Sequence, residues 1–176
     1  MTIQEFWQLL ADSKATAAGD LARQEQQLIR ELAKLEPAQI VEFECRLREC
    51  LIEADDFGIM AAQKIIDGYV SDDPYLYFRC WLVGQGETLF GNALRSPDTL
   101  AAVVVEPYLE FEALLYVATT AFEQRTGQTE EDETFPRSVA SDRGLDYDFG
   151  AVTKGEDWRE EQLPKMLPRL WAKFGG

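Results

Sequence analysis

The residues best equipped for chemistry lie close together, in the stretch DGYVSDDPYLYFRCWLVGQG from Asp67 to Gly86. Aspartates, an arginine and a cysteine occur there among five aromatic residues. Asp72 and Asp73 directly precede Pro74, and acidic residues followed by proline are typical of the first turn of a helix. Both aspartates can therefore be explained as a helix start, without catalysis.

Arg79 is the exception in this stretch, because apolar residues surround it on nearly every side of the predicted helix. A buried guanidinium needs a carboxylate partner and several hydrogen bonds, and removing that partner costs on the order of 3–5 kcal/mol. Three interpretations remain open for Arg79: a structural clamp on a carboxylate, an anion or substrate clamp beside a pocket, or simple exposure. The candidate carboxylates are Asp67, Asp72, Asp73 and Glu112.

Other catalytic chemistry has little support. The chain has no histidine, which removes the usual general base and the commonest metal ligand. Its three cysteines, Cys45, Cys50 and Cys80, form no CxxC motif, so we expect reduced, buried thiols. The acidic run Glu53–Asp56 lacks the spacing of an EF-hand loop. We therefore predict no metal, no cofactor and no catalytic residue, which favours a binding protein over an enzyme.

The charge of the chain restricts its partners. Seventeen basic against 32 acidic residues give a formal net charge of −15. Because nucleic-acid affinity comes from lysines and arginines at phosphates, nucleic-acid binding is disfavoured, whereas a basic protein partner is favoured. No run of 18 apolar residues and no secretion signal is present, so the sequence predicts a cytoplasmic, bacterial-type protein that does not span a membrane. The sequence leaves the oligomeric state open.

The elements that must position these residues are helices. Apolar residues recur at helical spacing through most of the chain, and Thr2 with Glu5 has the pattern of a capping box. A proline or glycine marks several boundaries: Pro107 is expected to begin a long helix that Gly127 ends. The segment AAVVV before it could also form a strand. The expected helices lie near residues 2–10, 20–35, 37–54, 59–67, 72–85, 87–95 and 107–126, with a broken one after 158.

Residues 128–157 differ from the rest, because they are acidic, rich in turn residues and without periodicity. We expect an extended loop or arm whose aromatic residues partly contact the helices. The predicted fold is mainly α: residues 1–176 form a single helical bundle of about seven or eight helices, with a long acidic irregular segment near the C-terminus.

Four blocks in this order, EFWQLL, SDDPYLYFRCWLVGQG, LLYVATTAFEQRTG and LPRLWAKF, are similar to the bacterial family of domain of unknown function 4240. The resemblance extends over essentially the whole chain. It implies no catalytic residues, since the family has no assigned activity. It does imply that the family is built around five positions: Asp72, Asp73, Arg79, Trp81 and Gln85.

Two functions remain as hypotheses. The first is a non-catalytic acidic protein-interaction module, of which one form is an inhibitor or immunity-type protein that binds a basic partner. Residues 128–157 could present its surface. The alternative is a small-molecule or anion-binding protein, of which one form is hydrolytic, with a pocket at the start of the central helix near Asp72, Asp73 and Arg79.

Overall fold

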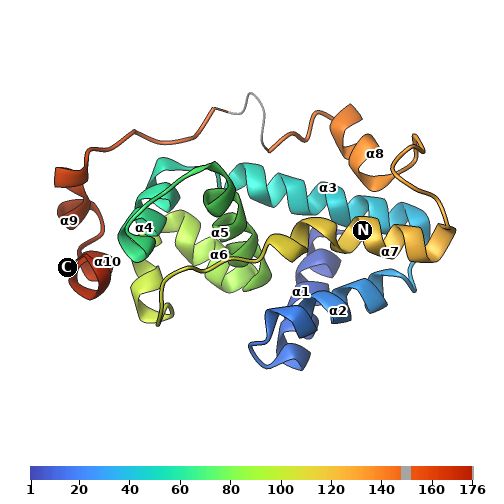
Figure 1. Cartoon of the computed structure of the whole chain (residues 1–176), viewed down its shortest axis with the longest axis horizontal. Helices are drawn as coiled ribbons and strands as arrows, with labels where there is room; N and C mark the ends of the chain where they lie inside the picture. Colours follow the sequence, from blue (N-terminus) through green and yellow to red (C-terminus); the bar gives the residue numbers. More distant parts are fainter. Residues whose placement is uncertain (148–151, 176) are drawn as a thin grey trace.

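The computed structural model describes residues 1–147 and 152–175, and in these residues the fold is helical (Figure 1). They contain ten α-helices, three 3-10 helices and no β-strand, which confirms the mainly α class. The α-helices are α1 (Ile3–Ala17), α2 (Leu21–Leu32), α3 (Pro37–Glu53), α4 (Phe57–Asp67), α5 (Asp72–Gly84), α6 (Glu87–Arg95), α7 (Val117–Thr126), α8 (Pro136–Asp142), α9 (Leu163–Met166) and α10 (Pro168–Phe174). The 3-10 helices are η1 (Pro97–Ala102), η2 (Glu112–Tyr116) and η3 (Glu160–Gln162).

Local sequence explains many of the helix boundaries. Thr2 and Glu5 form the predicted capping box at the start of α1. Gly68 and Gly127 end α4 and α7 in the left-handed conformation, at φ 79° and 73°, which glycine adopts without steric cost. Pro37 occupies the first turn of α3, where its missing amide hydrogen is not needed.

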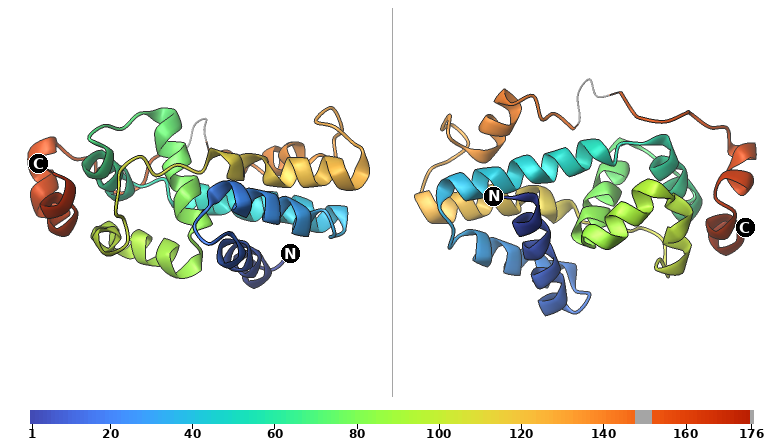
Figure 2. Two further views of the ribbon diagram at one scale, coloured as in Figure 1. Left: turned by 60° about the horizontal axis from the view of Figure 1, so that its bottom comes forward. Right: turned by 180° about the vertical axis from the view of Figure 1, so that it is seen from behind.

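The helices are arranged around α3 and α5. In Figures 1 and 2, α7 lies alongside α3, α1 and α2 form a pair across one side, and α8 lies on α3. At the other end of the molecule, α10 packs on α4 and η1. No helix in the part of the chain that the structure describes is long and apolar enough to cross a membrane.

The core is continuous and rich in phenylalanine. Its largest fully buried side chains include Phe6 of α1, Phe43 of α3, Phe78 of α5 and Phe122 of α7. Helix α5 is the central element, because its side chains are buried from Phe78 to Gly84 without interruption. The predicted position of this helix in the middle of the core is therefore confirmed.

Two segments differ from the expectation. Pro107 does not begin a helix: residues 103–111 form an irregular, non-helical segment, and helical structure starts only at Glu112. Hydrogen bonds to other elements hold this segment, because the Tyr108 amide donates to Asp67 at 2.7 Å and the Phe111 amide donates to the Tyr77 carbonyl at 3.1 Å. Tyr108 also has a φ of 62°, which interrupts any right-handed helix there.

The second difference lies in residues 128–157, which are not irregular throughout. Residues 136–142 form α8, and Phe135 and Ala140 are buried against the other helices. Phe135 meets Phe122 edge to face, with ring centroids 5.8 Å apart. Burial of these apolar groups is the physical reason that the turn-rich, acidic segment contains an ordered helix. Residues 148–151 lie outside the described residues.

Candidate functional site

The five residues implied by the family resemblance lie along α5 rather than in one place. Asp72 and Asp73 are exposed in the first turn, whereas Arg79 and Trp81 are buried and Trp81 stacks on Phe78. Gln85 is half-buried at the C-terminal end of the helix. At 1.5 Å per residue the two ends of α5 are about 20 Å apart. Asp72 and Gln85 therefore cannot contact the same small ligand.

Arg79 has a carbonyl, not a carboxylate, as its hydrogen-bond partner. One guanidinium nitrogen donates to the Leu51 carbonyl at 3.0 Å, and the guanidinium lies over the Tyr75 ring, 4.7 Å from its centroid. Leu51 belongs to the last turn of α3, where carbonyls lack helical partners and favour a cation. Within the described residues, no carboxylate lies within 4.0 Å of Arg79. The expected arginine–carboxylate clamp is therefore replaced there by a clamp on a helix end.

A buried arginine–carboxylate pair exists one helix away, in α3. Arg48 donates to Glu44 at 2.7 Å and to the Leu145 carbonyl at 3.0 Å, and its guanidinium lies 5.1 Å from the Tyr147 ring centroid. Burial raises the pKa of Glu44, and the attraction of Arg48 opposes that shift. This pair attaches residues 145–147 to α3, which is a structural role.

The thiols do not form a reactive site. All three cysteines are buried, and burial raises the pKa of Cys50 to about 12 and that of Cys80 still further. A thiolate is therefore strongly disfavoured at both positions. Among the residues described, no three acidic or cysteine side chains converge as metal ligands would.

Several cavities open on the surface, and none of those described here is lined by Asp72, Asp73 or Arg79. One cavity, of about 500 Å³, lies between α1, α3 and α6 and is lined by Trp7, Glu53 and Glu87 among others. A second cavity of about 460 Å³ lies at the opposite end of α5 from the aspartates, where Gln85 contributes to its wall. Asp72 and Asp73 are exposed, so the start of α5 is part of the molecular surface.

That surface is built by two segments that lie side by side. The loop before α5 carries Tyr69, and the irregular segment 103–111 carries Tyr108, whose ring centroid is 6.4 Å from that of Tyr69. Tyr108 is 62% exposed and Tyr69 is 42% exposed. The bond from the Tyr108 amide to Asp67 fixes one segment against the other. Burial raises the pKa of Asp67, and the bonds from Tyr108 and Gln63 oppose the shift.

Tyr77 of α5 continues the same surface toward η2. Partial desolvation, together with the nearby carboxylates of Glu112 and Asp73, raises the pKa of Tyr77 to about 12. The Tyr116 hydroxyl, also close to Tyr77, lies 3.5 Å from Glu112. We call this surface the acidic tyrosine face, and define it by Tyr69, Asp73, Tyr77, Tyr108, Glu112 and Tyr116.

The charge of the face is of one sign. Residues 65–78 and 103–116 contain neither lysine nor arginine. Cations from other elements reach the margins of the two segments. Lys64 donates to the Gly68 carbonyl at 3.1 Å, Lys173 donates to the Val104 carbonyl, and Arg137 of α8 lies over the Tyr116 ring, 5.0 Å from its centroid. The two segments contribute six carboxylates: Asp67, Asp72, Asp73, Glu106, Glu110 and Glu112.

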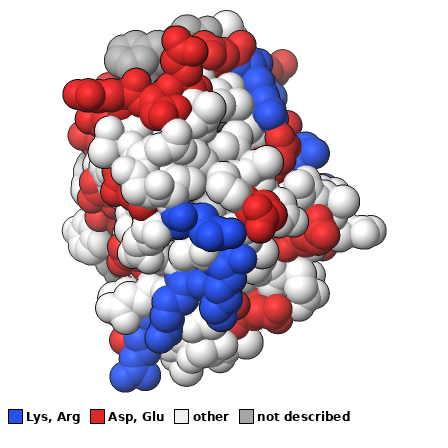
Figure 3. All heavy atoms as spheres, turned by 90° about the vertical axis from the view of Figure 1, so that its right-hand side faces the viewer, with Lys and Arg blue, Asp and Glu red and all other residues white. Residues whose placement is uncertain are grey.

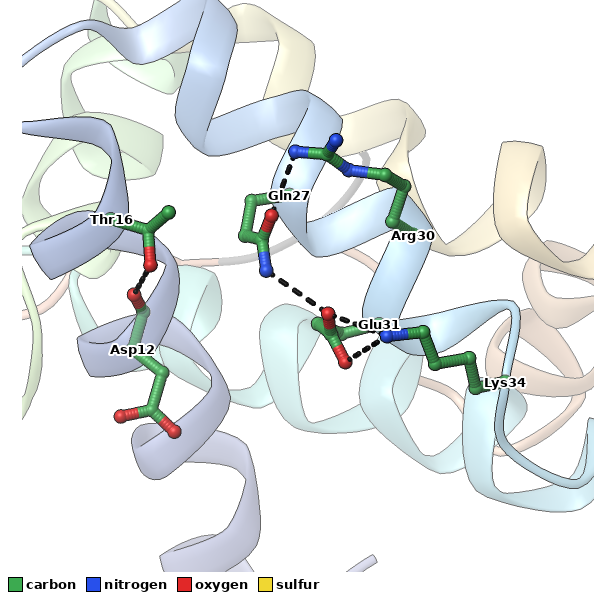
Figure 4. Close-up of polar contacts among 6 residues, drawn as sticks. All are labelled: Asp12, Thr16, Gln27, Arg30, Glu31 and Lys34. Carbon is green, nitrogen blue, oxygen red and sulfur yellow. Dashed lines mark hydrogen bonds and ion pairs between the residues drawn. The ribbon is translucent and has the colours of Figure 1, made fainter.

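Basic residues gather elsewhere. Figure 3 shows a band of lysines and arginines over the end of the molecule where α2 and α7 end. The exposed cations in and directly after these helices include Arg30, Lys34 and Arg125. Neighbouring polar groups already bind them. Lys34 donates to both oxygens of Glu31, whereas Arg30 donates to Gln27, which in turn donates to Glu31 (Figure 4). The charge of −15 is thus distributed unevenly over the surface.

Sequence reasoning reached only part of the acidic tyrosine face. It singled out Asp73 of this face, but it missed the contribution of residues 103–116, because it expected a helix from Pro107 on and left the preceding AAVVV as a possible strand. One signal was available: no lysine or arginine occurs between Arg95 and Arg125. The pairing of this segment with the loop at Tyr69 depends on tertiary contacts.

Comparison with known proteins identifies a family, but no individual curated protein or solved structure that is similar to this chain. A family model described as "Protein of unknown function (DUF4240)" matches residues 1–124 of the 176 residues. This region includes α1 to α6 and all residues of the acidic tyrosine face. No curated protein and no solved structure matches the chain.

Proposed function

The chain belongs to the DUF4240 family, which has no assigned activity, and we propose from its own residues that it is a non-catalytic protein-interaction module that binds a basic partner protein. The acidic tyrosine face is the proposed contact surface. The observation that carries this proposal is the combination of six carboxylates and four accessible tyrosines in two segments without a lysine or arginine.

The chemistry of the face suits lysine and arginine side chains. Exposed tyrosine rings attract cations by about 0.5–1 kcal/mol each, and carboxylates beside them add charge complementarity. Arg137 over Tyr116 is an example of this contact within the chain itself. Tyrosine is also among the residues enriched at protein interfaces, because it adds large contact area with little loss of conformational entropy.

A surface of this kind would suit an inhibitor or immunity-type protein. Enzymes that act on nucleic acids carry lysines and arginines at their active sites to bind phosphates. An acidic protein that covers such a site competes for the same cations. The net charge of −15 would accelerate the encounter with this basic partner.

The proposal can be tested with a short fluorescent oligoarginine peptide as the probe. The double variant D73N/E112Q removes two charges from the face, and we expect its affinity for the peptide to fall by about tenfold, equivalent to about 1.4 kcal/mol. The control E130Q/E131Q removes two exposed charges from the loop before α8 and should change affinity less than about twofold. Fluorescence anisotropy at one fixed salt concentration measures both.

Both double variants change the net charge from −15 to −13, since each removes two carboxylates. Equal losses of affinity would mean that the peptide responds to net charge alone, and the proposed face would be wrong. The variant Y108G tests the tyrosines separately. Glycine accepts the positive φ of Tyr108, so we expect weaker peptide binding without a loss of fold stability.

The alternative expectation, an anion pocket at the start of α5, gains no support from the geometry. Asp72 and Asp73 are exposed carboxylates that repel anions, and Arg79 is buried and bonded to the end of α3. We therefore propose no ligand pocket at that end of the helix.

A further inference from the structure

The C-terminal end of α5, at Gln85, adjoins a cavity whose lining differs from that of the other cavities described. The cavity has a volume of about 460 Å³ and lies along α6, which runs between α1 and α10 (Figures 1 and 2). Leucine and valine side chains provide its apolar surface. Its polar lining comes from Lys14, Gln85, Thr88, Asn92, Thr99 and Arg169.

The charged groups of this lining are both positive. Lys14 of α1 and Arg169 of α10 contribute to it, and no carboxylate does. Each of the four other cavities described has at least one carboxylate in its wall, as expected for a chain with 32 acidic and 17 basic residues. The cavity along α6 therefore has a lining whose formal charges are all positive, in a protein with a net charge of −15.

Lys14 retains hydrogen-bonding capacity. Its ammonium group donates to the Gln85 carbonyl at 3.0 Å, which uses one of three donors. Within the described residues no carboxylate lies within ion-pair distance of it. Partial burial lowers the pKa of Lys14, because the charged form loses hydration that nothing in the described chain fully replaces. An anion beside Lys14 would restore that stabilisation.

Arg169 adds positive charge from the other side. Its guanidinium is largely exposed, and the nearest carboxylate, that of Asp98, is 4.0 Å away. Asp98 already accepts hydrogen bonds from the backbone amides of Arg169 and Leu170. Asp98 therefore neutralises Arg169 only in part.

Neutral donors complete the lining. Thr88 lies in the first turn of α6, whose N-cap is Gly86, so no side chain caps the amides of that turn. The Asn92 side chain accepts from Arg95 at 2.6 Å and keeps its own amide hydrogens for other partners. Hydroxyl and amide donors of this kind orient an anion that a cation attracts.

We propose that this cavity binds a small organic anion whose acidic group contacts Lys14, while its apolar part lies against the leucine and valine side chains. The volume is in the range of small-molecule sites, about 300–1,000 Å³. This function goes beyond the proposed interaction with a basic partner and does not depend on it, because the two sites share no residue.

A purely structural role for Lys14 makes a different prediction. Lys14 and Gln24 both donate to carbonyls at the C-terminal end of α5, where cations and amides stabilise unpaired carbonyls. If this is the whole function of Lys14, its replacement lowers stability and leaves anion binding unchanged. Binding and stability must therefore be measured separately.

The test uses phenyl phosphate as the probe, with benzylamine as a cation of similar size. We expect phenyl phosphate to bind saturably and benzylamine not to bind, as measured by NMR titration of the amides of residues 85–92. The variant K14Q should weaken phenyl phosphate binding by about tenfold or more, the effect of losing a charge-assisted hydrogen bond. R169Q should weaken it less, since Arg169 is more exposed.

The matched control is K34Q, which removes an exposed ammonium from the turn after α2 and should leave phenyl phosphate binding unchanged. Binding should also raise the pKa of Lys14, which can be followed through its side-chain carbon resonances. The proposal is wrong if phenyl phosphate does not saturate, if benzylamine binds equally well, or if K14Q and K34Q have the same effect. R169Q provides an independent result should K14Q fail to fold.

Discussion

The buried arginines show how the same residue type reaches two different solutions. Arg48 has Glu44 as its partner within α3, whereas Arg79 has the end of α3 and the face of Tyr75. A helix C-terminus carries about half a negative charge, so it can replace a carboxylate. One side-chain nitrogen of Arg79, Nε, is buried without a hydrogen-bond partner among the described residues. The Arg79 side chain is therefore closely packed, although not all of its hydrogen-bond donors have a partner.

This arrangement predicts how substitutions of Arg79 behave. We expect Arg79→Ala to lower the free energy of unfolding by about 4 kcal/mol, because it leaves a cavity and an unpaired carbonyl. Arg79→Met fills the cavity and should cost about 2 kcal/mol. Urea denaturation measures both values.

The pH dependence of the same variants identifies the partner. If the hydrogen-bond partner of Arg79 is a carbonyl, the loss in free energy of unfolding caused by Arg79→Met stays constant between about pH 3.5 and 7. A carboxylate partner would become protonated as the pH falls, so the difference in free energy of unfolding between the original protein and Arg79→Met would become smaller. A difference that becomes smaller in acid would contradict the assignment of the Leu51 carbonyl.

At the scale of elements, the end of α5 determines the course of the segment that carries the acidic tyrosine face. Gly84 lies against Phe111, and a Cβ added at Gly84 would be 2.7 Å from the Phe111 ring. The same Phe111 donates its amide to Tyr77. A glycine in the last turn of α5 therefore permits the close approach that positions residues 103–111.

Gly84→Ala should therefore destabilise the protein, although alanine is the better helix former. We expect a loss of about 1–2 kcal/mol, since overpacking against the buried Phe111 ring exceeds the gain in helix propensity. The control Gly91→Ala, in α6, meets only the flexible end of Arg95 at 3.4 Å and should stabilise by about 0.5–1 kcal/mol. Thermal denaturation compares the two, and equal shifts of Tm would refute the role of Gly84.

At the scale of the whole molecule, charge has opposite consequences for folding and for binding. A net charge of −15 on 176 residues causes repulsion within the folded chain. The lysines and arginines that offset it include a band over the end of the molecule where α2 and α7 end (Figure 3). Salt screens both this repulsion and the attraction to a basic partner.

Added salt should therefore stabilise the fold and weaken the proposed interaction. Between about 0.01 and 0.5 M NaCl, where the Debye length falls from about 30 Å to a few ångströms, we expect Tm to rise and oligoarginine affinity to fall. Differential scanning calorimetry and anisotropy measure the two effects on the same samples. A Tm that falls with salt would show that attractive ion pairs outweigh the repulsion. Affinity that salt does not change would contradict an electrostatic interface.

The sequence by itself determined the helical class, the capping box at Thr2, the glycine ends at Gly68 and Gly127, and the burial of the helix that carries Arg79. These features depend on residues a few positions apart, so local periodicity and capping chemistry suffice to predict them. The total charge likewise needs no structure, and it is the basis of the expected basic partner.

Only the tertiary structure decided which groups meet. The partner of Arg79 lies 28 residues away, and Tyr108 reaches Asp67 across 41 residues. The expected helix start at Pro107 was wrong, because contacts with Asp67 and Tyr77 hold residues 108–111 in a non-helical course and helical structure begins at Glu112. Local propensity contains no information on such contacts. The cavity at Lys14 likewise depends on the packing of α1, α6, η1 and α10, which no local pattern in the sequence specifies.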